Sequence, residues 1–370
     1  MKFIALRSNV KDAISIIEKA VGENANLPIL KNILIEAREG VVVFSATNLE
    51  IAINHKVAGK VIEEGRVSPP LGLLSSLIGN IRSDRLNFET KGNNLDVTTD
   101  NYNAVVNGLP VEDFPITPSI KNKEGSISIK GAILKEAIQQ VVVASQFSDM
   151  RPELNSVLLN FSLENIVFAA TDGFRLAEKT LSKTLFSVKN KDTFKILIPL
   201  RSALEMARVI KEEENVDIFW DENQILAVTE KTEIISRLIE GNFPDYSGIL
   251  PQKFDAEIVV NKDEFSSGIK LAGVFGQKNS EVKIKIHENK KAIEITSADQ
   301  VLGENKQTIP AKIKGDINEI FFNWRFLGDA VKGVGTEDIF LGLQEDGGPA
   351  LIRSVSDTSY FYILKPILKV

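Results

Sequence analysis

The 370-residue chain contains no cysteine and only two histidines, and these absences remove several classes of site. Without cysteine there can be no disulfide framework, thiolate metal centre or cysteine nucleophile. His55 and His287 stand alone, with no second histidine at metal-ligand spacing, so we expect both to be structural or surface residues. Two isolated histidines also give no basis for a Ser-His-Asp triad. We therefore expect no cofactor, no metal and no catalytic residue.

Phosphate loops and membrane segments are also missing. No GxxxxGK[ST] motif occurs, and the nearest glycine cluster, Gly333-Val334-Gly335, is better explained as the end of a helix. No apolar run reaches the length of a membrane span. The first twenty residues also lack the apolar core of a signal peptide. We expect a cytoplasmic protein with no membrane association.

The bulk composition is that of a globular protein, with 43% hydrophobic and 25% charged residues. The length corresponds to two or three domains, each large enough for its own core. A net charge of −6 argues against a generally basic nucleic-acid binder. It leaves open a protein whose basic residues are gathered on one surface.

A threefold repeat organises the chain, and its first sign is three pairs of helical patterns. The first helix of each pair is predicted from apolar residues at helical spacing, and the second from a similar segment further along. The six predicted helical segments are 9–22, 69–81, 130–145, 199–211, 261–276 and 323–335.

A strand pair with a polar turn follows the first helix of each repeat. The turns are SATNLE (45–50), AATDGF (169–174) and TSADQV (296–301), and the Asn or Asp lies 39, 42 or 38 residues after the helix start. The middle copy has strands at Ser156–Phe161 and Asn165–Ala170, and by itself it is compatible with an ordinary hairpin. Its recurrence favours an α+β fold of three tandem domains, 1–120, 121–251 and 252–370, each with two helices packed on antiparallel sheets.

The predicted helices are more basic than the rest of the chain. With the second and fifth windows extended to 69–82 and 261–278, which adds Arg82 and Lys278, their net charges sum to +6, so the remaining residues carry −12. A solvated helical face explains this modest segregation, but positive helices on an acidic body also suit sequence-independent contact with phosphates.

Several stretches taken in order resemble the bacterial sliding clamp family, the beta subunit that holds the replicative DNA polymerase on its template. They are NLPILKNILIEA (26–37), ATNLE (46–50), RPELNSVLLNF (151–161), ATDGFRLA (170–177), EGNFPDY (240–246) and Pro366 near the C-terminus. The resemblance covers the whole chain and implies a head-to-tail homodimer whose six domains form a closed ring. Such a clamp is not an enzyme. It encircles double-stranded DNA without regard to sequence.

The resemblance also implies where DNA and the second protomer bind. Helix cations would face the DNA, and they are Arg82, Lys135, Arg201, Arg208, Lys211, Lys270, Arg325 and Lys332. The contact between protomers would join domain 1 to domain 3 and include Val106, Val274 and Phe275, of which Val274 and Phe275 would supply apolar burial.

Partner proteins of the family dock short linear motifs in a cleft between domains 2 and 3. The replicative polymerase, the clamp loader and repair proteins are the partners that this implies. Carried over position by position, the cleft residues are Leu154, Thr171, Gly173, Phe174, Arg175, Leu176, Pro244, Ile249, Ile363, Leu364, Lys365, Pro366, Ile367 and Leu368. Independently, an apolar C-terminal tail containing proline predicts a short strand edge that an extended peptide can join.

Four positions depart from the family pattern. Asn24 lies in a loop that often carries a DNA-contacting arginine, and Gly72 lies at a helix start that is usually basic. Lys365 stands where an apolar residue is common, and Phe174 where histidine is often found.

Two alternatives stay open at this point. A monomeric adaptor of the same fold would bind partner peptides without encircling DNA, which the residues at positions 24 and 72 would explain. An enzyme could instead use Asp172, Arg175 and Asp245, although TDG and PDY are common turn sequences.

Overall fold

Each of the six predicted helical segments overlaps one α-helix in the computed structural model, which describes residues 1–22, 26–116, 119–120, 126–147, 151–189, 193–276, 280–345 and 347–368. Five of the helices lie wholly inside their segments, and the first begins two residues before its segment. The helices are α1 (Arg7–Ile17), α2 (Leu71–Asn80), α3 (Gly131–Val142), α4 (Leu200–Val209), α5 (Lys262–Phe275) and α6 (Trp324–Gly333). None of these helices is long and apolar enough to cross a membrane, as far as the described residues go.

Asparagine side chains begin both helices of the third repeat. The Asn261 carboxamide oxygen accepts the N–H groups of Asp263 and Glu264, at 3.0 and 3.2 Å. Asn323 accepts the N–H of Arg325 in the same way, at 3.0 Å. These bonds satisfy donors that have no partner within the helix, and the acidic first turn of α5 also favours its N-terminus. The two helices therefore begin where their sequences predict.

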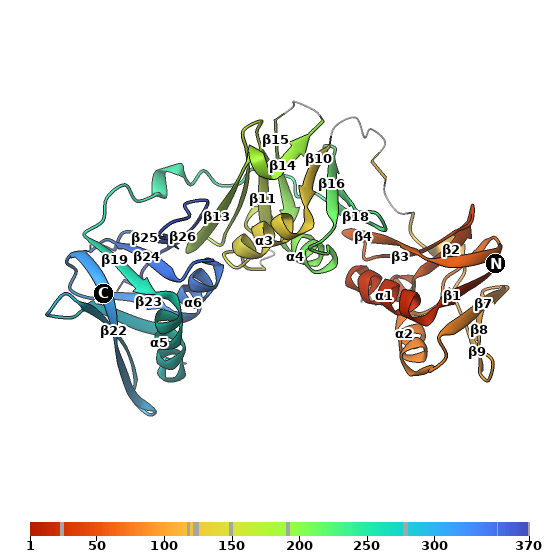
Figure 1. Cartoon of the computed structure of the whole chain (residues 1–370), viewed down its shortest axis with the longest axis horizontal. Helices are drawn as coiled ribbons and strands as arrows, with labels where there is room; N and C mark the ends of the chain where they lie inside the picture. Colours follow the sequence, from red (N-terminus) through yellow and green to blue (C-terminus); the bar gives the residue numbers. More distant parts are fainter. Residues whose placement is uncertain are drawn as a thin grey trace. The chain divides into compact units, whose positions relative to one another are not determined.

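The chain divides into two units, and the first contains Met1–Lys135, Phe186–Lys191 and Glu205–Leu238. In it, α1 packs against α2 and against two strands of a nine-stranded sheet (Figure 1). That sheet runs β14 (Phe186–Val188), β10 (Ile127–Lys130), β16 (Asn215–Trp220), β17 (Gln224–Val228), β18 (Thr232–Arg237), β4 (Ile51–Val57), β3 (Val41–Thr47), β2 (Leu34–Arg38), β6 (Gly65–Val67). A second sheet runs β5 (Gly59–Glu63), β1 (Lys2–Leu6), β7 (Arg85–Lys91), β8 (Asn94–Thr98), β9 (Asn103–Val106).

The second unit contains Glu136–Leu185, Asp192–Leu204 and Ile239–Val370 and is built on one twelve-stranded antiparallel sheet. In it, α5 packs beside α6 and against β21 and β22 (Figure 1). The order is β15 (Phe194–Pro199), β11 (Ser156–Phe161), β12 (Asn165–Thr171), β13 (Arg175–Ser182), β26 (Tyr360–Leu364), β25 (Ala350–Ser354), β24 (Asp338–Leu343), β19 (Ala256–Asn261), β22 (Gly303–Gly315), β21 (Ala292–Asp299), β20 (Glu281–Ile286), β23 (Ile320–Asn323). The predicted strands β11 and β12 are confirmed.

The repeated polar turn has the same hydrogen bonds in all three copies. Asn48 accepts the N–H groups two and three residues ahead, at 3.0 and 2.9 Å. Asp172 does so at 2.9 and 3.1 Å, and Asp299 at 2.8 and 3.0 Å. A short side-chain acceptor that closes its own turn is why Asn and Asp recur at this place. The threefold repeat read from the sequence is therefore present in the structure.

His55 is buried where β4 pairs with β18 inside the first unit. Its Nδ1 lies 2.9 Å from the Thr232 hydroxyl, and the strands pair directly at these two residues. Burial lowers the pKa of His55, and Lys211 and Lys231 lower it further, whereas Asp12 acts in the opposite direction. The neutral imidazole is thus the form that the fold accommodates.

Stability should consequently fall as the pH drops below the ordinary histidine pKa of 6.5. Because the pKa of His55 is lower in the folded chain, the unfolded chain binds the proton first and is favoured. The loss is at most about 1.4 kcal/mol per pH unit. We expect the melting temperature to fall between about pH 7 and about pH 5.5, and His55→Gln to reduce that fall. If the melting temperature fell equally in the His55→Gln variant, protonation of His55 would not be the cause of the lost stability.

Candidate functional site

The TDGFR segment, at the end of β12 and the start of β13, forms a turn fixed by its own side chains. The Thr171 hydroxyl donates to the Arg175 carbonyl at 2.6 Å and accepts the Gly173 N–H at 3.1 Å. Gly173 has a φ of +88°, which favours glycine. Phe174 follows with 65% of its surface exposed. The sequence thus holds a large aromatic side chain outward on a rigid turn.

The Arg175 guanidinium is 8% exposed and is held from several sides. Its Nε lies 3.0 Å from Asp172, and its Nη1 lies 2.8 Å from Asp329 on α6. The Tyr362 hydroxyl is 3.4 Å from the same Nη1, and the guanidinium stacks on Phe326 with its carbon 4.0 Å from the ring centroid. Burial acts to lower the pKa of Arg175, but Tyr362, Asp329 and Asp172 outweigh it and raise the pKa. Arg175 therefore stays charged and fixed.

An aromatic anchor holds the EGNFPDY segment to the second unit. Phe243 is buried, and its ring packs edge-on to Tyr246 with centroids 6.0 Å apart. The Tyr246 hydroxyl donates to Glu178 at 2.5 Å, and burial together with this carboxylate raises the pKa of Tyr246 far above its usual range. The core residues against Phe243 are Leu158, Ala169 and Leu197. This packing and this hydrogen bond thus fix the position of a segment that forms no regular strand.

These elements enclose an apolar cleft of about 570 Å³ within the second unit. Its lining comes from the turn before β11, the TDGFR turn with the start of β13, the segment from 244 to 252, the loop between β24 and β25, and the end of β26. The lining residues are Arg151, Leu154, Thr171, Gly173, Phe174, Arg175, Leu176, Pro244, Asp245, Tyr246, Gly248, Ile249, Leu250, Pro251, Gln252, Gln344, Pro349, Ile363 and Lys365.

Ten of the fourteen residues predicted for the cleft line it, and the others lie at or beyond the end of β26. Leu364 is fully buried in the sheet, paired with Arg175 of β13 and Ala350 of β25. Pro366 and Ile367 are half-buried and Leu368 is exposed, but none of them is part of the cleft wall.

The expected free strand edge at the C-terminus is wrong. β26 lies between β13 and β25, so its backbone groups are used on both sides. In the tail that follows, the Lys365 N–H donates to the Phe174 carbonyl at 2.9 Å, and the Ile367 N–H donates to the Phe321 carbonyl at 2.7 Å. Pro366 has no N–H to offer. A ligand of the cleft therefore cannot extend the sheet along β26.

The predicted DNA-facing cations fall into two groups. Four form ion pairs, in which Lys135 meets Glu212, Arg208 meets Glu205, Lys211 meets Asp12 and Lys332 meets Asp329, with N···O distances from 2.7 to 3.4 Å. The other four are exposed, with no carboxylate within 4 Å in the part of the chain that the structure describes. They are Arg82, Arg201, Lys270 and Arg325.

Of the three residues predicted for the dimer contact, Val106 does not face the solvent. It ends β9, the edge strand of its sheet, with 1% of its surface exposed, whereas Val105 beside it is 57% exposed. The large apolar side chain that this strand exposes is therefore Val105. On α5, Val274 is 54% exposed and Phe275 is half-buried.

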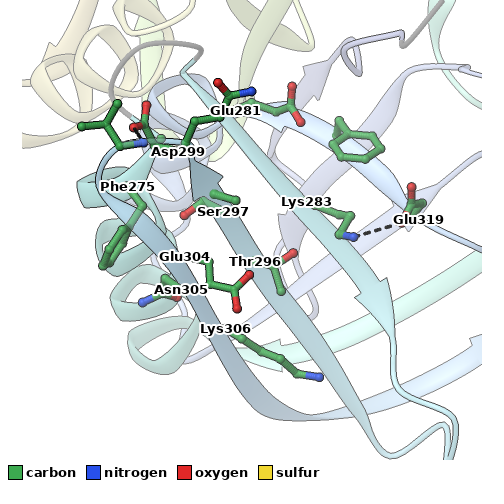
Figure 2. Close-up of a pocket in the computed structure, with 15 residues that line it drawn as sticks. Phe275, Glu281, Lys283, Thr296, Ser297, Asp299, Glu304, Asn305, Lys306 and Glu319 are labelled. Atoms are coloured by element: carbon green, nitrogen blue, oxygen red, sulfur yellow. Dashed lines mark hydrogen bonds and ion pairs between the residues drawn. The ribbon is translucent and has the colours of Figure 1, made fainter.

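A second pocket, of about 830 Å³, begins at Phe275 and crosses one face of the sheet formed by β20, β21 and β22 (Figure 2). Lys283 and Glu319 form an ion pair on its far side, at 3.2 Å. Val301, in the turn after β21, lines it and is one of the most exposed apolar residues.

The groups that an enzyme would use are already committed. Asp172 pairs with Arg175, and an oxygen of Asp245 accepts the N–H and hydroxyl of Ser247, at 3.0 and 2.7 Å. In the described part of the chain no cluster of three or more His, Asp or Glu side chains is arranged to hold a metal. Asn24 lies outside the described residues.

Three family models match the chain in succession. They describe the N-terminal, central and C-terminal domains of the DNA polymerase III beta subunit, and they match residues 1–118, 128–245 and 247–367. The chain belongs to the DNA polymerase III beta subunit family.

Known members of this beta subunit family are similar along their whole length. The beta sliding clamp of Synechococcus elongatus is 24% identical, with 99% of each chain covered, and that of Chlamydia pneumoniae is 26% identical with the same coverage. The solved sliding clamp of Bacillus subtilis superposes with a TM-score of 0.93 at 25% identity, covering 100% of both chains. The fold of three tandem clamp domains is thus confirmed, while the boundaries at 120 and 251 stay predictions.

The resemblance to the beta subunit family did not predict nine of the residues that line the cleft. Arg151, Asp245 and Tyr246 belong to motifs that it used, RPELNSVLLNF and EGNFPDY, so a signal was present. Gln344 and Pro349 come from the loop after β24, which had no motif.

Proposed function

We propose that the chain is a beta sliding clamp, a ring that encircles duplex DNA and tethers the replicative DNA polymerase to it. The observation that carries the proposal is the succession of three beta subunit domains over nearly all of the sequence. The protein acts by holding and sliding rather than by catalysis, and it works in the cytoplasm.

The ring is a homodimer that closes by joining the first domain of one protomer to the third domain of the other. The exposed apolar residues Val105 on β9 and Val274 on α5 support a contact between these two domains. β9 is also a sheet edge, and unpaired edges tend to be covered or paired. Two copies of one head-to-tail contact close the assembly.

The apolar cleft of the second unit takes short linear motifs of the polymerase, the clamp loader and repair proteins. Its support is an apolar lining with a few fixed polar groups, which is what peptide pockets require. The domains meet near residues 120 and 251 in this proposal, so the cleft draws on the second and third of them.

Retention on DNA without free ends tests the proposal most directly. The protein is loaded onto nicked circular plasmid with a clamp loader and ATP, and the complex is separated by gel filtration. We expect it to elute with the circle and to leave when the plasmid is linearised, because a ring slides off an open end. Sedimentation equilibrium should give twice the chain mass of 40.8 kDa.

A monomeric adaptor would give the opposite results. Its mass would stay at 40.8 kDa, and its retention would not differ between circular and linear plasmid. Either result would favour the monomeric adaptor over the ring as the function of this chain. Gly72, exposed at the start of α2 with no atom near the position of a Cβ, is the described residue that favours this second candidate.

A further inference from the structure

The walls of the apolar cleft carry more free positive than negative charge. Arg175 is neutralised by Asp172 and Asp329. Arg151 and Lys365 are exposed lining residues, and neither has a carboxylate within 4 Å among the residues that the structure describes.

Asp245 is the one acidic residue of the cleft lining, and it is exposed, with one carboxylate oxygen bonded within its own turn. Its Oδ1 accepts both the N–H and the hydroxyl of Ser247. These hydrogen bonds lower the pKa of Asp245, so it stays ionised and contributes one negative charge. It therefore compensates the two free cations only in part.

Lys365 is held in place at its backbone. Its N–H is bonded to the carbonyl of Phe174, and two residues later the Ile367 N–H is bonded to Phe321. The side chain thus starts from a fixed point beside the exposed Phe174 ring. A lysine anchored at the rim of an apolar cleft offers a positive charge next to an apolar binding surface.

We propose that the cleft selects peptides in which a carboxylate lies beside the apolar anchor, and that Lys365 is the residue that makes this selection. The proposal rests on the cleft being the partner site. Because β26 has no free edge, a peptide cannot join the sheet along β26, and side chains of the cleft wall can take part in its recognition. Complementary charge at a rim contributes to discrimination and to salt dependence, with about a threefold to tenfold effect on affinity.

The probes are fluorescein-labelled twelve-residue peptides tiled along the replicative DNA polymerase of the same organism. Those that bind are remade with every Asp changed to Asn and every Glu to Gln. Fluorescence anisotropy then gives the dissociation constants of each pair for the wild type, Lys365→Met and Lys312→Met. Lys312 is an exposed lysine of the same unit on β22, outside the cleft.

We expect the wild type to bind the acidic member of each pair about threefold to tenfold more tightly at low salt. Lys365→Met should bind both members alike, and Lys312→Met should behave as the wild type. Equal wild-type affinities, or a preference that survives in Lys365→Met, would overturn the inference alone. If no polymerase peptide binds the wild type, the partner site itself fails, and the inference fails with it.

Discussion

Replacing Arg175 by alanine should lower the free energy of unfolding by about 3 kcal/mol and weaken peptide binding in the cleft at least about tenfold. The guanidinium links the TDGFR turn to α6 through Asp329 and Phe326. Its removal leaves the Asp172 carboxylate, which is 7% exposed, with only backbone N–H partners. Leaving this buried carboxylate without its charged partner costs more free energy of folding than the intact ion pair contributes.

Arg353→Ala is the matched control for this variant. Arg353 also stacks on an aromatic ring, with its guanidinium carbon 4.6 Å from the Phe340 centroid, but it has no ion pair among the described residues and lies outside the cleft. We expect its loss to cost less than about 1 kcal/mol and to leave peptide affinity unchanged. Urea unfolding and anisotropy measure the two quantities. If Arg175→Ala cost no more than Arg353→Ala, the network would not hold the turn.

Local patterns in the sequence were enough to predict the elements that build the cleft. The two strands β11 and β12, and the turn after them, follow from alternating apolar residues and from Asp-Gly. Helix windows were also correct, although α1 ends at Ile17, earlier than its apolar pattern suggests, and continues as a short 3-10 turn. Short-range hydrogen bonds fix these features, so neighbouring residues carry the information.

Features that depend on distant parts of the chain could not be predicted in this way. Asp329 lies 154 residues from Arg175, and nothing near either residue indicates that they pair. The interior position of β26 depends on β13, which comes far earlier in the chain. That Val106 is buried and Val105 exposed was also not predictable, because a four-residue strand has too little alternation to tell one side from the other.

The presence or absence of a carboxylate partner divides the eight predicted DNA-facing cations into two groups. No sequence pattern indicated this division. The carboxylate partners of Lys211 and Lys135, for example, lie in other elements, on α1 and just after α4. A cation beside a carboxylate presents little net charge to a phosphate, whereas an unpaired exposed one presents all of it. The unpaired set should therefore carry most of the DNA binding.

Changing Arg82, Arg201, Lys270 and Arg325 together to glutamine is expected to weaken duplex binding at least about tenfold at low salt. The plot of log affinity against log salt should become shallower by roughly 0.9 for each phosphate that the variant no longer neutralises. A labelled duplex titrated at several salt concentrations gives both values. Sedimentation checks that the assembly is unchanged.

The paired set provides a control with the same change in net charge. A variant with Lys135, Arg208, Lys211 and Lys332 changed to glutamine also has four fewer positive charges, but each change frees a carboxylate that was already beside the cation. We expect a smaller decrease in affinity and little change in the salt slope. Equal decreases in the two variants would mean that overall charge governs DNA binding, and that local pairing does not select the residues responsible for it.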